Sequence, residues 1–484
     1  MKVKLIFVIA FFSVIVSLPV LAKNKAELTI YQVMQRVLDR YPSLKISEIE
    51  VLKSAEQRSQ VESSLGWILN SSAGITHDLT GLGTPSDRFD INGSLDRQLQ
   101  SGATLSLSGA YSYEDSSLSF SPVLPNPAHT TRLDLSYRLP LSQGQGNPLY
   151  SEGIVSAEAE YDLAKANQLL IRIDLAENVK ELYYSSALTH ARLINAEQSV
   201  QRAKKLEIYI NKNFKLGLAE EKDRLQARAQ LRSKLAELNA IKLTWEKQKI
   251  SLNRLMLEDW EKELQPTLFK FNDFNQDLHE IVNIIQDYHP AVKIADTKLT
   301  IAESQINTAR DTKKDNLDLV VSVGTRTSDG SNALGSSISE EDWAGAVRFE
   351  YRHLFDDKGV NSKLKQALLQ KNIALHEVQK VKDDIFYTAS GLLAEIQAAK
   401  IAVKSALEKL NSESLKLKEA VQRYRSGRAD TDQLIQFQNE YSFAVLAYQN
   451  QRIGLNQRII ALDIFTGRFW TNLTQGSNMH GVNR

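Results

Sequence analysis

FKLGLAEEKDRLQARAQL (Phe214–Leu231) and YRSGRADTDQLIQFQNEY (Tyr424–Tyr441) are two versions of one segment. Each begins with an aromatic residue, continues through two residues to a glycine, and then enters the acidic start of a helix. Glycine just past a helix end permits the left-handed backbone that stops the helix. Both stretches therefore predict two long helices joined by a tight turn, and the duplication predicts a fold that is built twice.

A second pair of segments extends the duplication. LTIYQVMQRVLDRYPSL (Leu28–Leu44) is echoed by LHEIVNIIQDYHPAV (Leu278–Val292), and both end in tyrosine, proline and an apolar residue. Each copy is expected to run in the order short helix, strands, very long helix, turn, long helix. The chain is therefore divided into a first repeat (23–260), a second repeat (261–470) and a C-terminal tail (471–484).

Composition limits the possible classes of protein. The chain has 484 residues, with 59 basic against 58 acidic side chains, and this balance argues against a nucleic-acid partner. It has no cysteine, which excludes disulfides, zinc–thiolate sites and thiol nucleophiles. The eight histidines show no metal-binding spacing, and no hydrolase, phosphate-loop or dinucleotide motif occurs. We therefore expect no enzyme, and no catalytic, cofactor-binding or metal-binding residues.

The N-terminal segment Met1–Ala22 reads as a secretory signal, with two lysines, an apolar centre and a Pro-Val-Leu-Ala end. We expect cleavage after Ala22; the alternative is an N-terminal membrane anchor, for which the apolar stretch is short. Without cysteine, no lipid anchor is expected at the mature N-terminus. No later apolar run is long enough for a transmembrane helix, so a mature chain in a membrane would have to span it as a closed barrel.

Six runs alternate apolar and polar side chains: Trp67–His77, Phe89–Leu99, Ala103–Tyr113, Arg132–Leu141, 316–326 and 344–354. A water-soluble sandwich would also alternate. Charge on the polar face, in strands of about 10 residues, favours membrane strands with a lipid-facing outside and a wet inside. Gln100-Ser101-Gly102 predicts a tight hairpin. Whether the 88–113 hairpin enters the sheet or packs outside as a flap stays open, which leaves four or six strands per copy.

The strands are followed in both copies by a very long helical segment, about 149–215 and 360–425, almost free of glycine and proline. Each would extend about 100 Å at 1.5 Å per residue. After the glycine turn the chain doubles back through a second helix, about 221–257 and 431–466. Apolar spacing in the last of these is heptad-like, so these antiparallel hairpins are expected to pack as coiled coils.

The ordered set of motifs resembles the TolC family of outer-membrane efflux and secretion channels over nearly the whole mature length. The motifs are LTIYQVMQRVLDRYPSLK and its echo, LSYRLPLSQGQG, VKELYYSSALTHARL (179–193), and the two turn segments NFKLGLAEEKD and RYRSGRADTDQL. The resemblance implies an α+β membrane protein, a homotrimer whose transmembrane β-strands form one shared barrel in outer-membrane lipid. It also implies long helical hairpins that form an α-barrel across the periplasm of a Gram-negative envelope.

The resemblance also implies partners and a docking site. The partners are a periplasmic adaptor (membrane fusion) protein and an inner-membrane pump of RND, ABC or MFS type. The site is the periplasmic tip, which in this family binds the adaptor and closes the idle pore. It matches the residues Leu216, Gly217, Leu218, Ser426, Gly427 and Arg428. The alternative is that the two glycines only terminate helices.

Two acids beside the second turn, Asp430 and Asp432, are expected to begin the following helix, where its dipole favours them. The alternative is that they line the aperture. Some family members hold an acidic ring just before this turn, whereas Leu415–Tyr424 is basic here with one glutamate. A cation-selective acidic gate is therefore not expected.

Three functions fit these observations. The first is the outer-membrane channel of a tripartite system, a passive exit for small molecules or drugs delivered by the pump and adaptor. The alternative is the exit duct of a type I protein secretion system, since fold does not determine cargo. A periplasmic coiled-coil scaffold without a pore is less favoured, because it gives no role to strands that have one apolar face and one charged face.

Overall fold

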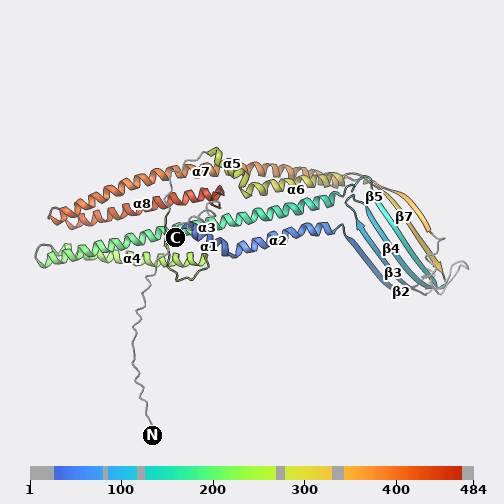
Figure 1. Ribbon diagram of the computed structural model, residues 1–484, viewed down its shortest axis with the longest axis horizontal. Coiled ribbons are helices and arrows are strands. Elements are labelled where there is room, and N and C mark those ends of the chain that lie inside the picture. Colours follow the sequence, from blue (N-terminus) through green and yellow to red (C-terminus); the bar gives the residue numbers. More distant parts are fainter. Residues whose placement is uncertain (1–26, 80–84, 117–125, 269–277, 330–342, 471–484) are drawn as a thin grey trace, which may run out of the picture. The chain divides into compact units, whose positions relative to one another are not determined.

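The computed structural model describes residues 27–79, 85–116, 126–268, 278–329 and 343–470 (Figure 1). The predicted signal (1–22) and tail (471–484) lie outside these described residues. Among the described helices, none combines the length and apolar character needed to cross a membrane.

The chain forms two compact units, each made of three segments. Met1–Val37, Val179–Asn272 and Ala399–Gln457 make the first unit; Leu38–Asn178, Asp273–Ala398 and Arg458–Arg484 make the second. Both units draw segments from both halves of the sequence, so the two repeats are interlaced rather than separate. The division at residues 260 and 261 stays an interpretation of the sequence.

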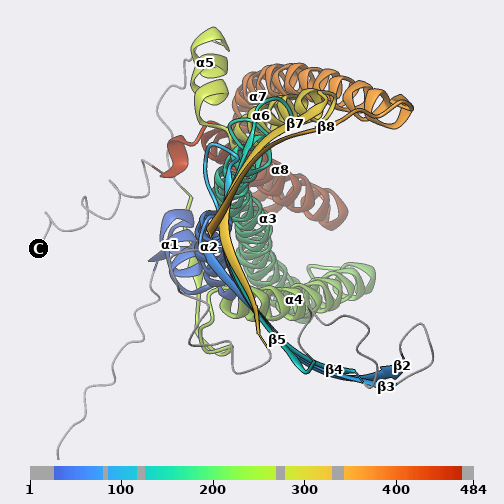
Figure 2. The same cartoon turned by 90° about the vertical axis from the view of Figure 1, so that its right-hand side faces the viewer.

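The second unit contains a six-stranded antiparallel sheet in the order β2-β3-β4-β5-β7-β8, which is strongly curved (Figure 2). The strands are β2 (Trp67–Leu79), β3 (Pro85–Gln98), β4 (Thr104–Ser116), β5 (Ala128–Pro140), β7 (Asn316–Asp329) and β8 (Trp343–Arg352). All six alternating runs are therefore strands, as the alternation predicts.

The flap alternative for the 88–113 hairpin is wrong. Its two strands pair with each other and also with β2 and β5, so the hairpin lies inside the sheet. At its turn the Leu99 amide donates to the Ala103 carbonyl at 2.8 Å. Gly102 takes φ +86°, a left-handed conformation that costs glycine little. The sheet has six strands per copy because continuous backbone pairing satisfies this hairpin on both sides.

Each copy contains one helix more than the sequence predicts before the strands. α1 (Ile30–Arg40) is followed by α2 (Pro42–Ser63), and α5 (Leu278–Tyr288) by α6 (Pro290–Thr312), before the strands begin. The expectation of one short helix per copy is therefore wrong. Proline has no amide hydrogen to lose in a first helical turn, so here it begins the next helix. The preceding residues, Tyr41 and His289, are extended with the same ψ of 126°.

The long helices have equal lengths in the two copies. α3 (Pro148–Lys215) and α7 (Lys358–Arg425) have 68 residues each. α4 (Glu221–Leu255) and α8 (Thr431–Phe465) have 35 residues each. α3 begins where the Asn147 side-chain oxygen accepts a hydrogen bond from the Tyr150 amide at 3.2 Å, ahead of Pro148. The predicted pair of helical hairpins is confirmed.

In the first unit, two short strands form a parallel pair, β1 (Glu27–Leu28) with β6 (Gln265–Pro266). Tyr183 of α3 is fully buried, and its hydroxyl lies 2.8 Å from the Leu28 carbonyl oxygen and 2.7 Å from that of Thr267. This side chain therefore connects a long helix to both short strands.

The ends of α4 and α8 use different residues for the same turn. Gly467 has φ +75° after α8, whereas Leu257 has φ +54° after α4. The Glu258 amide donates to the Asn253 carbonyl at 2.9 Å across the Leu257 turn. A left-handed conformation costs a residue with a Cβ about 1–2 kcal/mol, and Leu257 is half exposed, so its side chain offsets little of this cost.

Leu257→Gly is therefore expected to raise the free energy of unfolding by about 1 kcal/mol, measured by denaturant or thermal unfolding of the purified protein. Leu243→Gly is the matched control, since Leu243 is also exposed in α4 but helical. It should lower the same free energy by about 1 kcal/mol. Equal losses in both variants would contradict the strain at Leu257.

Candidate functional site

The two turns that join the long helices have the same backbone. Gly217 and Gly427 take φ +73° and +71°. The amide of the residue after each glycine donates to the carbonyl five residues earlier, at 2.8 Å in the first turn and 2.9 Å in the second. This is the glycine-ended helix terminus that satisfies the last free carbonyls. Helix termination by both glycines is thus confirmed.

The six residues predicted for the tip all lie at these turns and are exposed: Leu216, Gly217, Leu218, Ser426, Gly427 and Arg428. The first turn presents two apolar side chains, with Leu216 63% and Leu218 74% exposed. The second turn presents a serine and an arginine at the equivalent places. Docking of a partner at these turns stays a prediction.

Below the turns, the two hairpins pack against each other within the first unit. The buried residues of this cluster are Leu206, Ile210, Ala227, Ala420, Leu434 and Ile435, from all four long helices. At its edge the rings of Tyr209 and Tyr424 are 5.9 Å apart, and the Tyr424 hydroxyl lies 3.1 Å from Thr431 Oγ1. Burial raises the pKa of Tyr424, so it stays a neutral phenol at physiological pH. The two hairpins are therefore fixed to one another near their turns.

Asp430 begins α8 directly. Its Oδ1 accepts a hydrogen bond from the Gln433 amide at 2.7 Å, which satisfies a free amide of the first turn. Asp432 lies in that turn, where the helix dipole favours a negative charge. The first copy uses Glu220 and Asp223 for the same purpose at the start of α4. The helix-start interpretation of Asp430 and Asp432 is therefore supported by geometry.

Asp430→Ala is expected to destabilise the start of α8 by about 1 kcal/mol, because an amide loses its acceptor. Asp432→Ala, which removes only a favourable charge, should cost about 0.3 kcal/mol. Hydrogen exchange of the first-turn amides of α8 measures both effects. Comparable acceleration in the two variants would contradict the capping role of Asp430.

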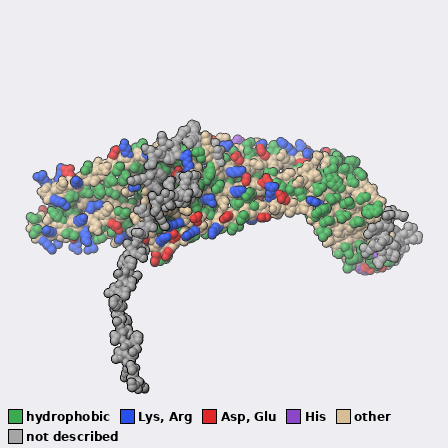
Figure 3. Space-filling view, viewed as in Figure 1, with side chains coloured by type: hydrophobic (Ala, Val, Ile, Leu, Met, Phe, Trp, Pro, Cys, Tyr) green, Lys and Arg blue, Asp and Glu red, His purple; other side chains and the backbone are tan. Residues whose placement is uncertain are grey.

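The sheet has one apolar face. The cross-strand pairs Leu107–Leu135, Leu135–Val323 and Val321–Val347 lie on it. Its side chains are uncovered in the isolated chain, Val347 being 66% and Phe349 70% exposed. In Figure 3 hydrophobic side chains cover this part of the molecule. Such a continuous exposed apolar surface marks contact with lipid or with another apolar surface.

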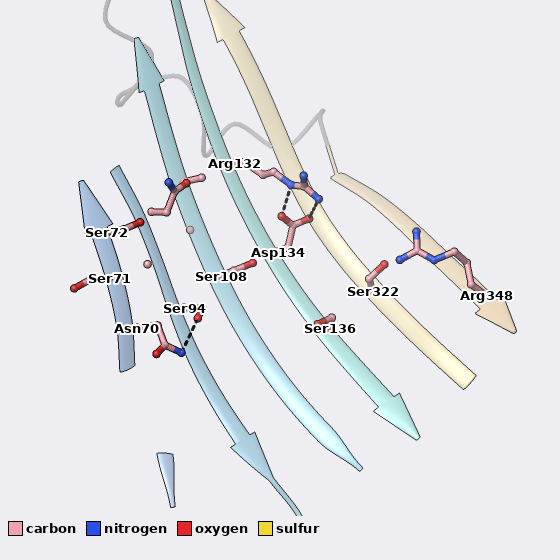
Figure 4. A pocket seen from close by; sticks show the side chains of 14 residues that line it. Asn70, Ser71, Ser72, Ser94, Ser108, Arg132, Asp134, Ser136, Ser322 and Arg348 are labelled. Carbon is pink, nitrogen blue, oxygen red and sulfur yellow. Dashed lines mark hydrogen bonds and ion pairs between the residues drawn. The ribbon is translucent and has the colours of Figure 1, made fainter. Parts of the chain in front are cut away.

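The opposite face is polar and hollowed. A cavity of about 650 Å³ is lined largely by serine, asparagine, glycine and charged side chains from all six strands (Figure 4). Arg132 pairs with Asp134, while Arg138 lies 2.7 Å from Asp318 and 2.8 Å from Glu350. These five charged groups on the polar face therefore neutralise one another in part.

Among the described residues, no three histidine, aspartate or glutamate side chains gather closely enough to hold a metal ion. The surfaces that stand out are therefore the apolar face of the sheet, its polar face and the two exposed turns.

No protein-family model and no curated protein matches the sequence. The structure, however, is similar to solved outer-membrane proteins. VceC from Vibrio cholerae aligns with TM-score 0.67 and 16% identity, over 90% of this chain and 96% of that chain. The CmeC outer-membrane channel of Campylobacter jejuni gives 0.66 and 17%, over 90% and 85%. The open-state MtrE outer-membrane channel of Neisseria gonorrhoeae gives 0.58 and 16%, over 90% and 88%.

The chain therefore has the outer-membrane channel fold. This confirms the fold expected from the resemblance to the TolC family, and the CmeC and MtrE structures are described as outer-membrane channels. At these identities the likeness establishes the architecture alone.

Proposed function

We propose that this chain is the outer-membrane channel of a tripartite export system and assembles as a homotrimer. Six strands per copy give eighteen in a trimer, closed into one barrel with the apolar face toward lipid. The observation that carries the proposal is the two-faced sheet, which is apolar and uncovered on one side and polar and hollow on the other. A membrane barrel needs both surfaces on the same strands.

Two further features support assembly with other copies. β2 and β8 are the edge strands of the sheet and carry backbone groups that pairing within one chain leaves unsatisfied. Pairing of these edges with neighbouring copies satisfies the backbone groups, which would otherwise be exposed to lipid without a hydrogen-bond partner at a high energetic cost. The long helices also carry exposed apolar side chains, such as Phe443 at 70% and Ile401 at 72%, that a single chain does not cover.

The proposed partners follow from the same architecture. The chain supplies a conduit and no energy-converting chemistry, so an inner-membrane pump and a periplasmic adaptor are proposed to load it. The adaptor is proposed to dock at the exposed turns around Gly217 and Gly427. We propose small molecules as cargo, with selection made by the pump because a water-filled duct discriminates weakly.

Single-channel recording in a planar lipid bilayer tests the proposed pore. The purified mature protein should insert and give uniform conductance steps, whereas the heat-denatured protein should not. A folded protein that associates with the bilayer but never conducts would contradict the duct and favour a scaffold.

Deletion of the gene in its host tests the cargo. The export of small molecules predicts greater sensitivity to apolar drugs and detergents, restored by the intact gene. Unchanged sensitivity, combined with loss of one large protein from the medium, would overturn the small-molecule cargo and leave the pore itself in place.

A further inference from the structure

A cavity of about 290 Å³ lies between α3, α7 and α8 in the first unit, next to the buried cluster below the two turns. Its lining includes apolar side chains such as Leu417 and two aromatic residues, Tyr209 and Tyr424. Three cations also line it: Arg202, Lys205 and Arg425. No acidic residue contributes to it. The cavity therefore combines apolar walls with an uncompensated positive charge.

Arg202 is the most informative of the three cations because it is half-buried and has no carboxylate partner among the residues that the structure describes. Its Nη2 donates to Ser199 Oγ at 2.8 Å and to Ser442 Oγ at 2.6 Å. The guanidinium carbon lies 5.4 Å from the centre of the Tyr441 ring. Buried arginines are ordinarily paired with an acid, since removing the charge from water is costly.

The two serines hold the guanidinium in place. Ser199 Oγ and Ser442 Oγ are themselves 3.1 Å apart, and each also donates to a backbone carbonyl of its own helix, at 2.8 Å and 3.0 Å. Burial lowers the pKa of Arg202, but from so high a value that it remains charged at neutral pH. Nε and Nη1 have no protein acceptor among the described residues, so donors remain for a ligand.

We propose that this cavity binds an amphipathic organic anion, with its acidic head on Arg202, Lys205 and Arg425 and its apolar part against the leucines and the two tyrosine rings. A guanidinium and an ammonium group together recognise a carboxylate, sulfonate or sulfate head. The volume is near the lower end for small-ligand pockets, about 300–1,000 Å³, so it favours a short-chain amphiphile. Lys and Arg side chains also gather over this end of the hairpins (Figure 3). This proposal is about ligand binding only, and it does not depend on whether the chain forms a conducting pore.

Isothermal titration calorimetry of the full-length protein in phosphatidylcholine nanodiscs tests the site, after the heat measured with empty nanodiscs is subtracted. The probes share one tail: octane sulfonate as the anion, octylammonium as the cation and octanol as the neutral compound, all below micelle-forming concentrations. Octane sulfonate should bind at least about tenfold more tightly than the other two, the factor expected for one charge-assisted hydrogen bond. Equal binding of all three, or none by the sulfonate, would overturn the proposal.

Substitutions of the lining residues test whether octane sulfonate binds in this cavity. Arg202→Gln should weaken octane sulfonate about tenfold or more. The double variant Lys205→Gln/Arg425→Gln should also weaken it, and both residues are exposed, so folding should be unaffected. Lys204→Gln is the matched control, since Lys204 is exposed on α3 and does not line the cavity, and it should bind as the parent does. Unchanged affinity in both test variants, or an equal loss in the control, would contradict the assigned site.

Discussion

Leu135→Arg is expected to abolish most insertion of the folded protein into lipid bilayers. Leu135 lies near the middle of β5, between Leu107 of β4 and Val323 of β7, on the apolar face of the sheet. If that face meets lipid, an arginine near the bilayer centre costs about 2–4 kcal/mol per copy. In a homotrimer the cost is incurred once in every copy. The folded fraction after reconstitution, measured by protection from added protease, should fall sharply.

Ser136→Arg is the matched control because it places the same side chain one residue later, on the opposite face. Ser136 lines the polar hollow together with Arg132 and Asp134. Insertion should remain close to that of the parent protein, while single-channel conductance changes because a new charge enters the wet face. Equal loss of insertion in both variants would contradict the assignment of the two faces.

Tyr183→Phe is expected to lower the free energy of unfolding by about 1–3 kcal/mol, the cost of leaving a buried polar group without its partner. The Tyr183 hydroxyl accepts a hydrogen bond from the Thr267 amide at 3.1 Å. It has one hydrogen to donate, to the carbonyl of Leu28 or of Thr267. The Leu28 carbonyl also accepts a hydrogen bond from the Thr267 amide at 3.1 Å, so it keeps a donor in the variant. The Thr267 carbonyl is then the group that loses its hydrogen bond to the hydroxyl.

Denaturant unfolding of the purified protein measures this effect. Tyr387→Phe is the control, since Tyr387 is 72% exposed in α7 and its hydroxyl has no partner among the described residues. It should change the free energy of unfolding by less than about 0.5 kcal/mol. Burial raises the pKa of Tyr183, so the difference between the two variants should persist through mildly alkaline conditions. A loss no larger than that of the control would contradict the proposed link between α3 and the short strands.

Much of the fold could be predicted because its signals are local. The glycine turns at Gly217 and Gly427 fix where the long helices end, and strict alternation marks each strand with its polar and apolar faces. Gln100–Gly102 predicts a hairpin equally well. The position of that hairpin in the sheet, however, depends on pairing with β2 and β5. Such pairing between distant segments leaves little trace in a single sequence.

The parts that escaped prediction depend on ambiguous or long-range signals. Pro42 and Pro290 can end one helix or begin another, and the extended residue before each decides for the second outcome. Arg202 and Ser442 are 240 residues apart, and nothing in the heptad spacing pairs them. The six predicted turn residues lie at the turns, as the sequence predicts. The cation-lined cavity near them could not be predicted, because it forms only where the two hairpins pack against each other.

Electron microscopy of the protein in lipid nanodiscs tests whether three copies form one channel. We expect a threefold particle with one closed ring of strands, six from each copy, continuous with a tube of long helices. The hairpin at 88–113 should be part of the ring, and the edges β2 and β8 should meet between neighbouring copies. A monomeric particle, or copies whose sheets remain open and separate, would contradict the proposed channel.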